Sequence, residues 1–240
     1  MSPHNWIHLP CQGILVDDLQ LRRVESCLPE FPFRSSPLGF VPKPNNGLRR
    51  IHHLSHTQLT STNARIEPEF GFLRYSQISE VWNHIVAAGR GSFIMKNDWE
   101  AAFRNIPIAP QDRWMMGFQW EGKFYKECCL PFGLRTAPFL FNLFAEALHW
   151  ILQSWLGWEY TCHLLDDIVL VTPHSQRYQL RDRVHDFVRL TNFLGIPRND
   201  GKFELGQVVT VFGYELDTRA LPCASHLRRW KRYKLRQTLC

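Results

Sequence analysis

The sequence lacks any apolar run long enough to cross a membrane, although 45% of its 240 residues are hydrophobic. A transmembrane helix needs about 20 consecutive, mostly apolar residues. The first residues, MSPHNWIHLPCQ, also lack the basic-then-apolar pattern of a signal peptide. We therefore expect an intracellular protein, cytoplasmic or nuclear, that has no membrane partner and is long enough for one or two domains with a real core.

Paired cysteine motifs and repeats are missing as well. The seven cysteines are an odd number and contain no C-x-x-C pair. This favours a reducing compartment and argues against both a disulfide framework and a zinc finger. No internal repeat and no low-complexity linker interrupts the chain.

Acidic residues are missing from the last stretch, residues 221–240, which carries six basic side chains. The whole chain has 28 basic and 22 acidic residues, so without those six the two signs balance. Overall basicity is therefore weak evidence for a nucleic-acid partner, whereas the tail is a local basic patch. The alternative is a solvated tail without a partner.

Two adjacent aspartates, Asp166 and Asp167, lie between two short apolar runs in YTCHLLDDIVLVTP. Such runs, rich in β-branched residues, predict two strands of a hairpin with the carboxylates at the bend. Mg²⁺ is bound through one or two carboxylates together with substrate phosphates. Asp-Asp is also an ordinary surface turn, so this motif alone leaves both interpretations open.

A third aspartate, Asp98, ends the apolar run of SFIMKNDWEAAFRNIPI. An aspartate at the end of one buried strand and an aspartate pair on a neighbouring hairpin can face each other. That arrangement holds two metal ions for phosphoryl or nucleotidyl transfer. A third stretch, LPFGLRTAPFLF, leads into a helix through Pro138, and its Gly133 permits a close backbone approach.

In this order, Asp98 with AFRNIP, then LPFGLRTAPFLF, then LLDDI resemble motifs A, B and C of reverse transcriptases. The resemblance covers residues 35–218 and includes SPLGFVPKP, RRIHHLSH and FGYELDT. Four segments are most similar in sequence to DIRS-type retroelements, which pair a reverse transcriptase with a tyrosine recombinase. These segments are RRIHHLSH, AFRNIP, GFQWEGKFY and FNLFAEALHWIL. No recombinase signature is present in this chain.

The resemblance implies an RNA-directed DNA polymerase that transfers nucleotides from dNTPs to a primer 3′-hydroxyl on an RNA or DNA template. It implies two Mg²⁺ ions, with Mn²⁺ as a substitute, and leaves the oligomeric state open. The implied metal ligands are Asp98, Asp166 and Asp167, and the implied acid for the leaving group is Lys202. The implied dNTP contacts are Lys43, Arg49, Ala101, Ala102, Phe103, Phe132 and Gly133, and the implied primer grip is Phe212 and Gly213. The alternatives are a core role for Phe103 and a plain surface role for Lys43, Arg49 and Lys202.

The implied fold is α+β: a right-hand polymerase palm, with an antiparallel sheet backed by helices, and β-rich fingers, with the thumb largely absent. The expected divisions are an N-terminal extension (1–30), fingers (31–89), palm with motif A (90–108), a fingers hairpin (109–130), the remaining palm (131–218) and a basic tail (219–240). Within them we expect a helix over 77–89, a helix apolar nearly all round over 138–155, an amphipathic helix over 175–194 and a strand over 208–216.

One departure from the family pattern keeps a second interpretation open. The residue two before the aspartate pair is usually Tyr or Phe in the family, and here it is Leu164. Together with residues 1–30, which show only a possible short helix over 15–23 and suggest a truncated or decayed N-terminus, it favours a decayed retroelement fragment. Such a fragment folds and binds nucleic acid without polymerising. A weaker third option is a polymerase-like module recruited as a scaffold.

Overall fold

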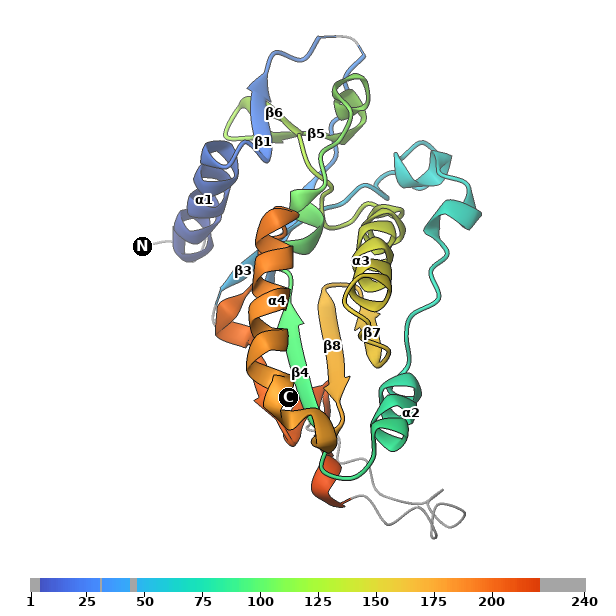
Figure 1. Ribbon diagram of the computed structural model, residues 1–240. Coiled ribbons are helices and arrows are strands. Elements are labelled where there is room, and N and C mark those ends of the chain that lie inside the picture. Colours follow the sequence, from blue (N-terminus) through green and yellow to red (C-terminus); the bar gives the residue numbers. More distant parts are fainter. Residues whose placement is uncertain (1–4, 31, 44–46, 221–240) are drawn as a thin grey trace. The chain divides into compact units, whose positions relative to one another are not determined.

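The computed structural model describes residues 5–30, 32–43 and 47–220, with side chains described from residue 12 onward, and the chain forms two compact units (Figure 1). The first unit contains Met1–Leu73 and Ala101–Phe141, and the second contains Arg74–Glu100 and Asn142–Cys240. The first boundary falls after Leu73, so the helix at 78–88 belongs to the second unit, whereas the sequence placed residues 31–89 together in the fingers. The reason is that this helix buries its apolar face against strands of the second unit.

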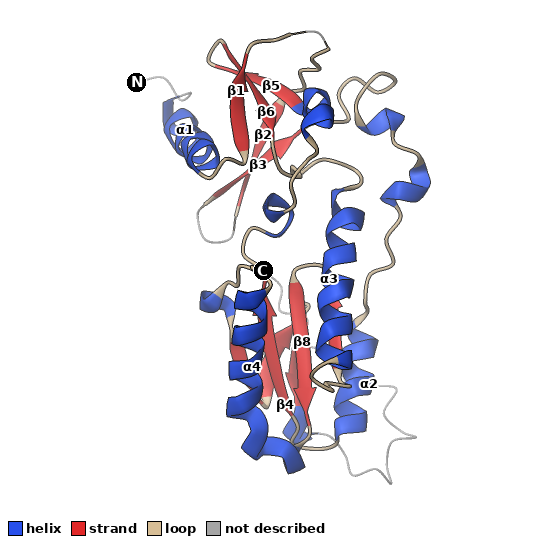
Figure 2. Cartoon of the chain, turned by 45° about the horizontal axis from the view of Figure 1, so that its top comes forward, coloured by secondary structure: helices blue, strands red, loops and turns tan. Residues whose placement is uncertain are grey.

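The second unit is built on an antiparallel four-stranded sheet with the order β7-β8-β4-β9. Its strands are β4 (Phe93–Asp98), β7 (Thr161–Leu164), β8 (Asp167–Thr172) and β9 (Glu204–Gly206). Three helices accompany it, shown in blue in Figure 2: α2 (Ile78–Ala88), α3 (Ala137–Ser154), which starts in the first unit, and α4 (Leu180–Phe193). The predicted antiparallel sheet backed by helices is confirmed.

The central strands of this sheet are buried on both faces. Ile94, Val169 and Val171 pack with Val81 and Ile85 of α2 on one face. Alternate residues such as Met95 and Leu170 line, with Leu180 and Val184 of α4, a small cavity on the other face. Burial on both faces explains why the sequence of β8 is a continuous apolar run and does not alternate between apolar and polar residues.

Residues 208–217 form a hairpin, where the sequence predicted one strand over 208–216. Strand β10 (Val208–Val211) pairs with β11 (Tyr214–Asp217). Phe212 and Gly213 connect them, with φ of +49° and +80°. Two successive positive φ values are typical of a type I′ turn, which matches the twist of the flanking strands. The two residues expected inside a primer-grip strand therefore lie at the tip of a hairpin.

The first unit contains a three-stranded sheet, β1-β6-β5, and a separate two-stranded hairpin, β2-β3. The strands are β1 (Val24–Cys27), β2 (Leu38–Pro42), β3 (Leu48–His52), β5 (Gly117–Trp120) and β6 (Lys123–Glu127). The predicted hairpin over 109–130 is observed as β5-β6, and β2-β3 forms a second hairpin. The turn at Glu121-Gly122 takes positive φ at both positions, which is typical of a type I′ turn. Most of the turn between β2 and β3, at Asn45-Asn46-Gly47, lies outside the described residues.

The N-terminal segment contributes to the first unit's core, where the sequence indicated only a possible short helix over 15–23. Helix α1 spans Asn5–Gln20, and β1 pairs along its whole length with β6. Leu15 and Val24 are buried together with Phe118 and Tyr125 of the β5-β6 hairpin. The sequence did not show this because the partners lie about a hundred residues further along the chain.

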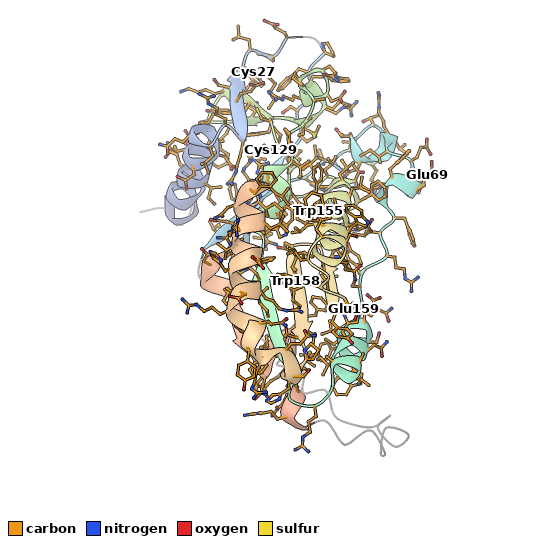
Figure 3. All side chains as sticks on the ribbon, viewed as in Figure 1. Cys27, Glu69, Cys129, Trp155, Trp158 and Glu159 are labelled. Atoms are coloured by element: carbon orange, nitrogen blue, oxygen red, sulfur yellow. The ribbon has the colours of Figure 1, made fainter. Side chains whose placement is uncertain are left out.

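Helix α3 differs from expectation in being buried on one face only. Phe141, Ala145, Leu148 and Leu152, at helical spacing, are at most 1% exposed. The opposite face is apolar but open, and among its residues Trp150 is 60% exposed. Beyond the helix, Trp158 is 4% exposed and Trp155 64% exposed (Figure 3). Pro138 lies in the first turn, as predicted. In the described part of the chain no helix is long and apolar enough to cross a membrane.

The remaining regular elements are short 3₁₀ turns. The predicted helix over 175–194 begins as such a turn and becomes α-helical at Leu180. These turns are Asn63–Arg65, Pro68–Gly71, Ala102–Asn105, Pro110–Met116, His174–Gln179, Asp200–Lys202 and Thr218–Ala220.

Candidate active site

The three predicted metal-binding aspartates lie at the same end of the β4-β8 pair, in the second unit. Asp98 ends β4, and its antiparallel partner is Asp167, the first residue of β8. Directly opposed residues of such a pair project to the same side of the sheet. Leu165 and Asp166 form the tight connection from β7, with Leu165 at φ +53°, and the Trp99 N–H donates to the Asp166 carbonyl at 3.0 Å.

The Asp166 carboxyl is within hydrogen-bonding reach of Asp98, and the environment favours its protonated form. Burial first, and then the nearby negative charge of Asp98, raise the pKa of Asp166 to about 6. Burial also raises the pKa of Asp167, against the opposing charge of Lys96. A group of buried like charges of this kind is relieved by a proton or by a cation.

Lys202 supplies one such cation. Its ammonium nitrogen lies 2.8 Å from Asp98 Oδ2, and this hydrogen bond raises the pKa of Lys202. Asp98 is 5% exposed, whereas the Lys202 side chain is 59% exposed. Lys202 is therefore a partner of the carboxylate cluster and can leave it for solvent.

The three aspartates offer the oxygen ligands that a divalent cation requires, but their side chains do not form a complete coordination sphere. Asp98 and Asp166 approach each other, and both present the oxygen ligands that Mg²⁺ prefers. Among the described residues, no three acidic, histidine or cysteine side chains converge closely enough to hold a metal ion. With Lys202 on Asp98, the carboxylates are partly neutralised by the protein itself.

The residues expected to contact the nucleotide lie in the first unit, and three of them form a cluster. The Arg49 guanidinium lies 4.7 Å from the centre of the Phe132 ring. The Phe103 ring lies 5.3 Å from Phe132 and 5.6 Å from Phe141. Arg49 is exposed, so its charge remains available on the aromatic surface.

Gly133 holds this cluster in place through a close backbone contact. It has a φ of +109°, and a Cβ atom there would lie 2.0 Å from the His52 carbonyl oxygen. The His52 N–H donates to the Phe132 carbonyl at 2.8 Å, and the Asn63 side chain donates to the Gly133 carbonyl at 2.8 Å. Asn63 also accepts the Arg135 N–H, a positioning role for which the sequence carried no signal.

Other predicted contacts remain outside this cluster. Ala101 and Ala102 have φ of +56° and +21°, an unusual backbone whose N–H groups suit an anion. Lys43 is exposed at the end of β2, where its N–H donates to the Gly47 carbonyl. In the described residues no hydrogen bond or ion pair is seen between Lys43 and Arg49, or between the Phe212-Gly213 turn and the carboxylates.

The chain belongs to the reverse transcriptase (RNA-dependent DNA polymerase) family, whose family model matches residues 41–216. A curated relative is the retrovirus-related Pol polyprotein from transposon gypsy of Drosophila melanogaster. It is 29% identical over 93 residues, which are 39% of this chain and 8% of that polyprotein.

Solved structures of foamy viral protease-reverse transcriptases share the fold. One, in complex with double-stranded DNA, has a TM-score of 0.68 at 18% identity and covers 87% of this chain and 33% of its own. Another, in complex with an RNA/DNA hybrid, has a TM-score of 0.62 at 18% identity and covers 91% of this chain and 26% of its own. The native prototype foamy virus enzyme has a TM-score of 0.64 at 20% identity, and the match covers 85% of this chain and 25% of that enzyme's chain. The palm and fingers architecture expected from the sequence is confirmed.

Proposed function

We propose that this chain is the RNA-directed DNA polymerase core of a retroelement, extending a primer 3′-hydroxyl with dNTPs on an RNA or DNA template. The observation that carries the proposal is the placement of Asp98 against Asp166 and Asp167, at the adjoining ends of β4 and β8. Buried, mutually repelling carboxylates cost stability in a plain structural role. They are useful where a cation and a triphosphate are to be bound.

Asp98, Asp166 and Asp167 would hold two Mg²⁺ ions, with Mn²⁺ as a substitute. When bound, the ions supply charge neutralisation at the reacting phosphate and activation of the attacking hydroxyl. Lys202, already beside Asp98, would move its ammonium to the leaving pyrophosphate and donate a proton there. Its exposure makes this movement possible without repacking the core.

Arg49, Phe132 and Phe103 would form the nucleotide pocket. The Arg49 charge would neutralise the triphosphate while the aromatic rings lie against the base and sugar. Phe103 would exclude a ribose 2′-hydroxyl by occupying its space. The left-handed backbone at Ala101-Ala102 and the exposed Lys43 would add anion contacts.

We infer a nucleic-acid partner and an intracellular setting. Relatives of the same fold have been solved with double-stranded DNA and with an RNA/DNA hybrid, and a template–primer is the corresponding ligand here. The four cysteines with described surroundings are free thiols, which suits a reducing compartment. We propose that the parent element is of the DIRS type, because of the sequences RRIHHLSH and FNLFAEALHWIL. Sequencing the locus tests this assignment, since a flanking tyrosine recombinase gene supports it and a flanking retroviral-type integrase gene contradicts it.

A second candidate, an inactive binding fragment, is favoured by one observation. Leu164, the register partner of Asp167, takes the place of the family's aromatic at the primer end. Primer extension on poly(rA)/oligo(dT) with Mg²⁺ or Mn²⁺ separates the two candidates. Extension by the wild type establishes the polymerase. Binding without extension supports the fragment, and Leu164→Tyr then shows whether motif C causes the defect.

A further inference from the structure

Four charged side chains from distant parts of the sequence form one buried network in the first unit. Arg50 of β3 donates to Asp18 of α1 at 2.6 Å and to Glu127 of β6 at 2.6 Å. Arg104 donates to the second oxygen of Glu127 at 2.8 Å and lies 3.4 Å from Asp18. All four side chains are at most 11% exposed.

The network is balanced, with two guanidiniums and two carboxylates. Burial disfavours the charge on Glu127, yet Arg50 and Arg104 together hold the pKa of Glu127 well below its ordinary value. Asp18 is the second anion, and it contacts both arginines. Without Asp18 the two buried guanidiniums share one carboxylate, and one buried positive charge is left uncompensated, which is strongly destabilising.

Each arginine of the network is the chain neighbour of a residue in the proposed nucleotide pocket. Arg50 follows Arg49, and because side chains alternate along a strand, Arg50 points inward while Arg49 lies over Phe132. Arg104 follows Phe103 and also donates to the carbonyls of Cys129 and Leu130, at 3.2 and 3.4 Å. These carbonyls are just ahead of Pro131 and Phe132, so Arg104 also holds the backbone that leads to Phe132.

Asp18 is unlike the other members because it lies outside the part of the chain that matches the family, residues 41–216. It reaches the network from α1, which is held against the unit by Leu15. Its neighbour Asp17 is exposed on the same helix. The N-terminal helix therefore contributes one specific charge to a network that borders the pocket.

We propose that Asp18 is a positioning residue for the nucleotide pocket, which holds Arg49 and Phe103 in place through Arg50 and Arg104. The proposal rests on the proposed polymerase function, and it assigns part of nucleotide selection to a helix that precedes the matched family region. Asp18 does not touch the nucleotide. Its loss shifts residues that do.

Single-nucleotide incorporation by Asp18→Asn, measured against wild type, tests the proposal. A shift of about 1 Å in Arg49 or Phe103 weakens nucleotide binding in a preorganised site, so the KM for dNTP is expected to rise roughly ten-fold. Discrimination against rNTPs falls with it, whereas kcat at saturating dNTP changes less. Asp17→Asn is the matched control and behaves as wild type. Asp18→Glu keeps the charge but lengthens the side chain, so it is expected to show the same changes at smaller size.

Amide hydrogen exchange gives a readout that does not depend on activity. In Asp18→Asn we expect faster exchange in residues 49–54, 101–106 and 128–134, as well as in α1. Unchanged KM and discrimination, or faster exchange confined to α1, overturns the proposal. If Asp18→Asn does not fold, Asp18→Glu carries the test, with the same changes expected at smaller size and their absence counting against the proposal. If the wild type extends no primer, the proposed function fails by itself, and the exchange pattern alone decides the role of Asp18.

Discussion

The ammonium of Lys202 lies 2.8 Å from Asp98 Oδ2, so the protein places its own cation on one of the proposed metal ligands. A bound Mg²⁺ and this ammonium compete for the same carboxylate. Lys202→Met is therefore expected to bind Mn²⁺ more tightly than wild type in the absence of nucleotide. The gain in affinity should be no more than several-fold, because an exposed ion pair contributes about 1 kcal/mol or less. Its maximal extension rate is expected to fall, because the acid for the leaving group is gone.

Titration of Mn²⁺ binding by electron paramagnetic resonance, beside rapid-quench kinetics, measures both effects. Lys123→Met, at an exposed position of β6, is the control for loss of a positive charge. Unchanged Mn²⁺ affinity in Lys202→Met would show that the ion pair with Asp98 does not compete with the metal.

The stability of the metal-free protein should depend on Asp166. Its pKa is about 6 in the folded protein, above its ordinary value of 3.8, so between these values the folded state binds a proton that the unfolded state has lost. The free energy of unfolding therefore falls as pH rises from about 4 to about 6. In Asp166→Asn this contribution disappears, and the variant is more stable than wild type at neutral pH.

Urea denaturation in chelator at a series of pH values checks this prediction, with Asp17→Asn as the exposed control. Added Mg²⁺ should recover stability at neutral pH in the wild type and recover less in Asp166→Asn. Parallel pH profiles for wild type and Asp166→Asn would rule out the proposed cost of ionising this carboxyl.

Much of this arrangement could be predicted from the sequence, because its signals are local. The strands that end at Asp98 and flank Asp166-Asp167 are short apolar runs. The hairpin at Phe212-Gly213 was missed because Phe is a poor predictor of positive φ. The open apolar face of α3 was missed because periodicity cannot distinguish a buried face from an exposed apolar one.

The charge network could not be predicted at all. Asp18, Arg50, Arg104 and Glu127 meet only after folding, and each one alone resembles a solvated surface charge in the sequence. The same holds for Asn63, whose side chain secures the loop at Gly133.

Replacing Gly133 by Ala should damage the first unit through contact as well as strain. The added Cβ would lie 2.0 Å from the His52 carbonyl oxygen, and φ is +109°. We expect a loss of at least about 1–3 kcal/mol in unfolding free energy, together with weaker dNTP binding, because Phe132 shifts with the loop. Thermal unfolding and KM for dNTP measure the two effects.

Gly122→Ala is the matched control for this substitution. Gly122 has a φ of +74° but nothing within 4 Å of the added atom. It therefore carries the backbone strain without the collision, and equal losses in both variants would show that the contact with His52 is unimportant.

Replacing Phe103 by Ala should relax sugar selection. The ring that packs on Phe132 is expected to form the pocket wall beside the ribose C2′. Extension with dNTP persists in part, and the ratio of dNTP to rNTP incorporation falls by roughly ten-fold or more, the scale of one lost side-chain contact in a specificity pocket. Phe193→Ala, at an 80% exposed position, is the control. Unchanged discrimination would assign Phe103 to the core alone.

The central claim is that Asp98, Asp166 and Asp167 form the catalytic centre of a polymerase. Primer extension by wild type and Asp166→Asn on poly(rA)/oligo(dT) with Mg²⁺, with template–primer binding measured in parallel, tests it most directly. We expect extension by the wild type and a collapse by orders of magnitude in Asp166→Asn, with binding retained, because one ligand charge is lost while the shape is kept. Equal extension by both proteins, or binding without extension by both, would contradict the claim.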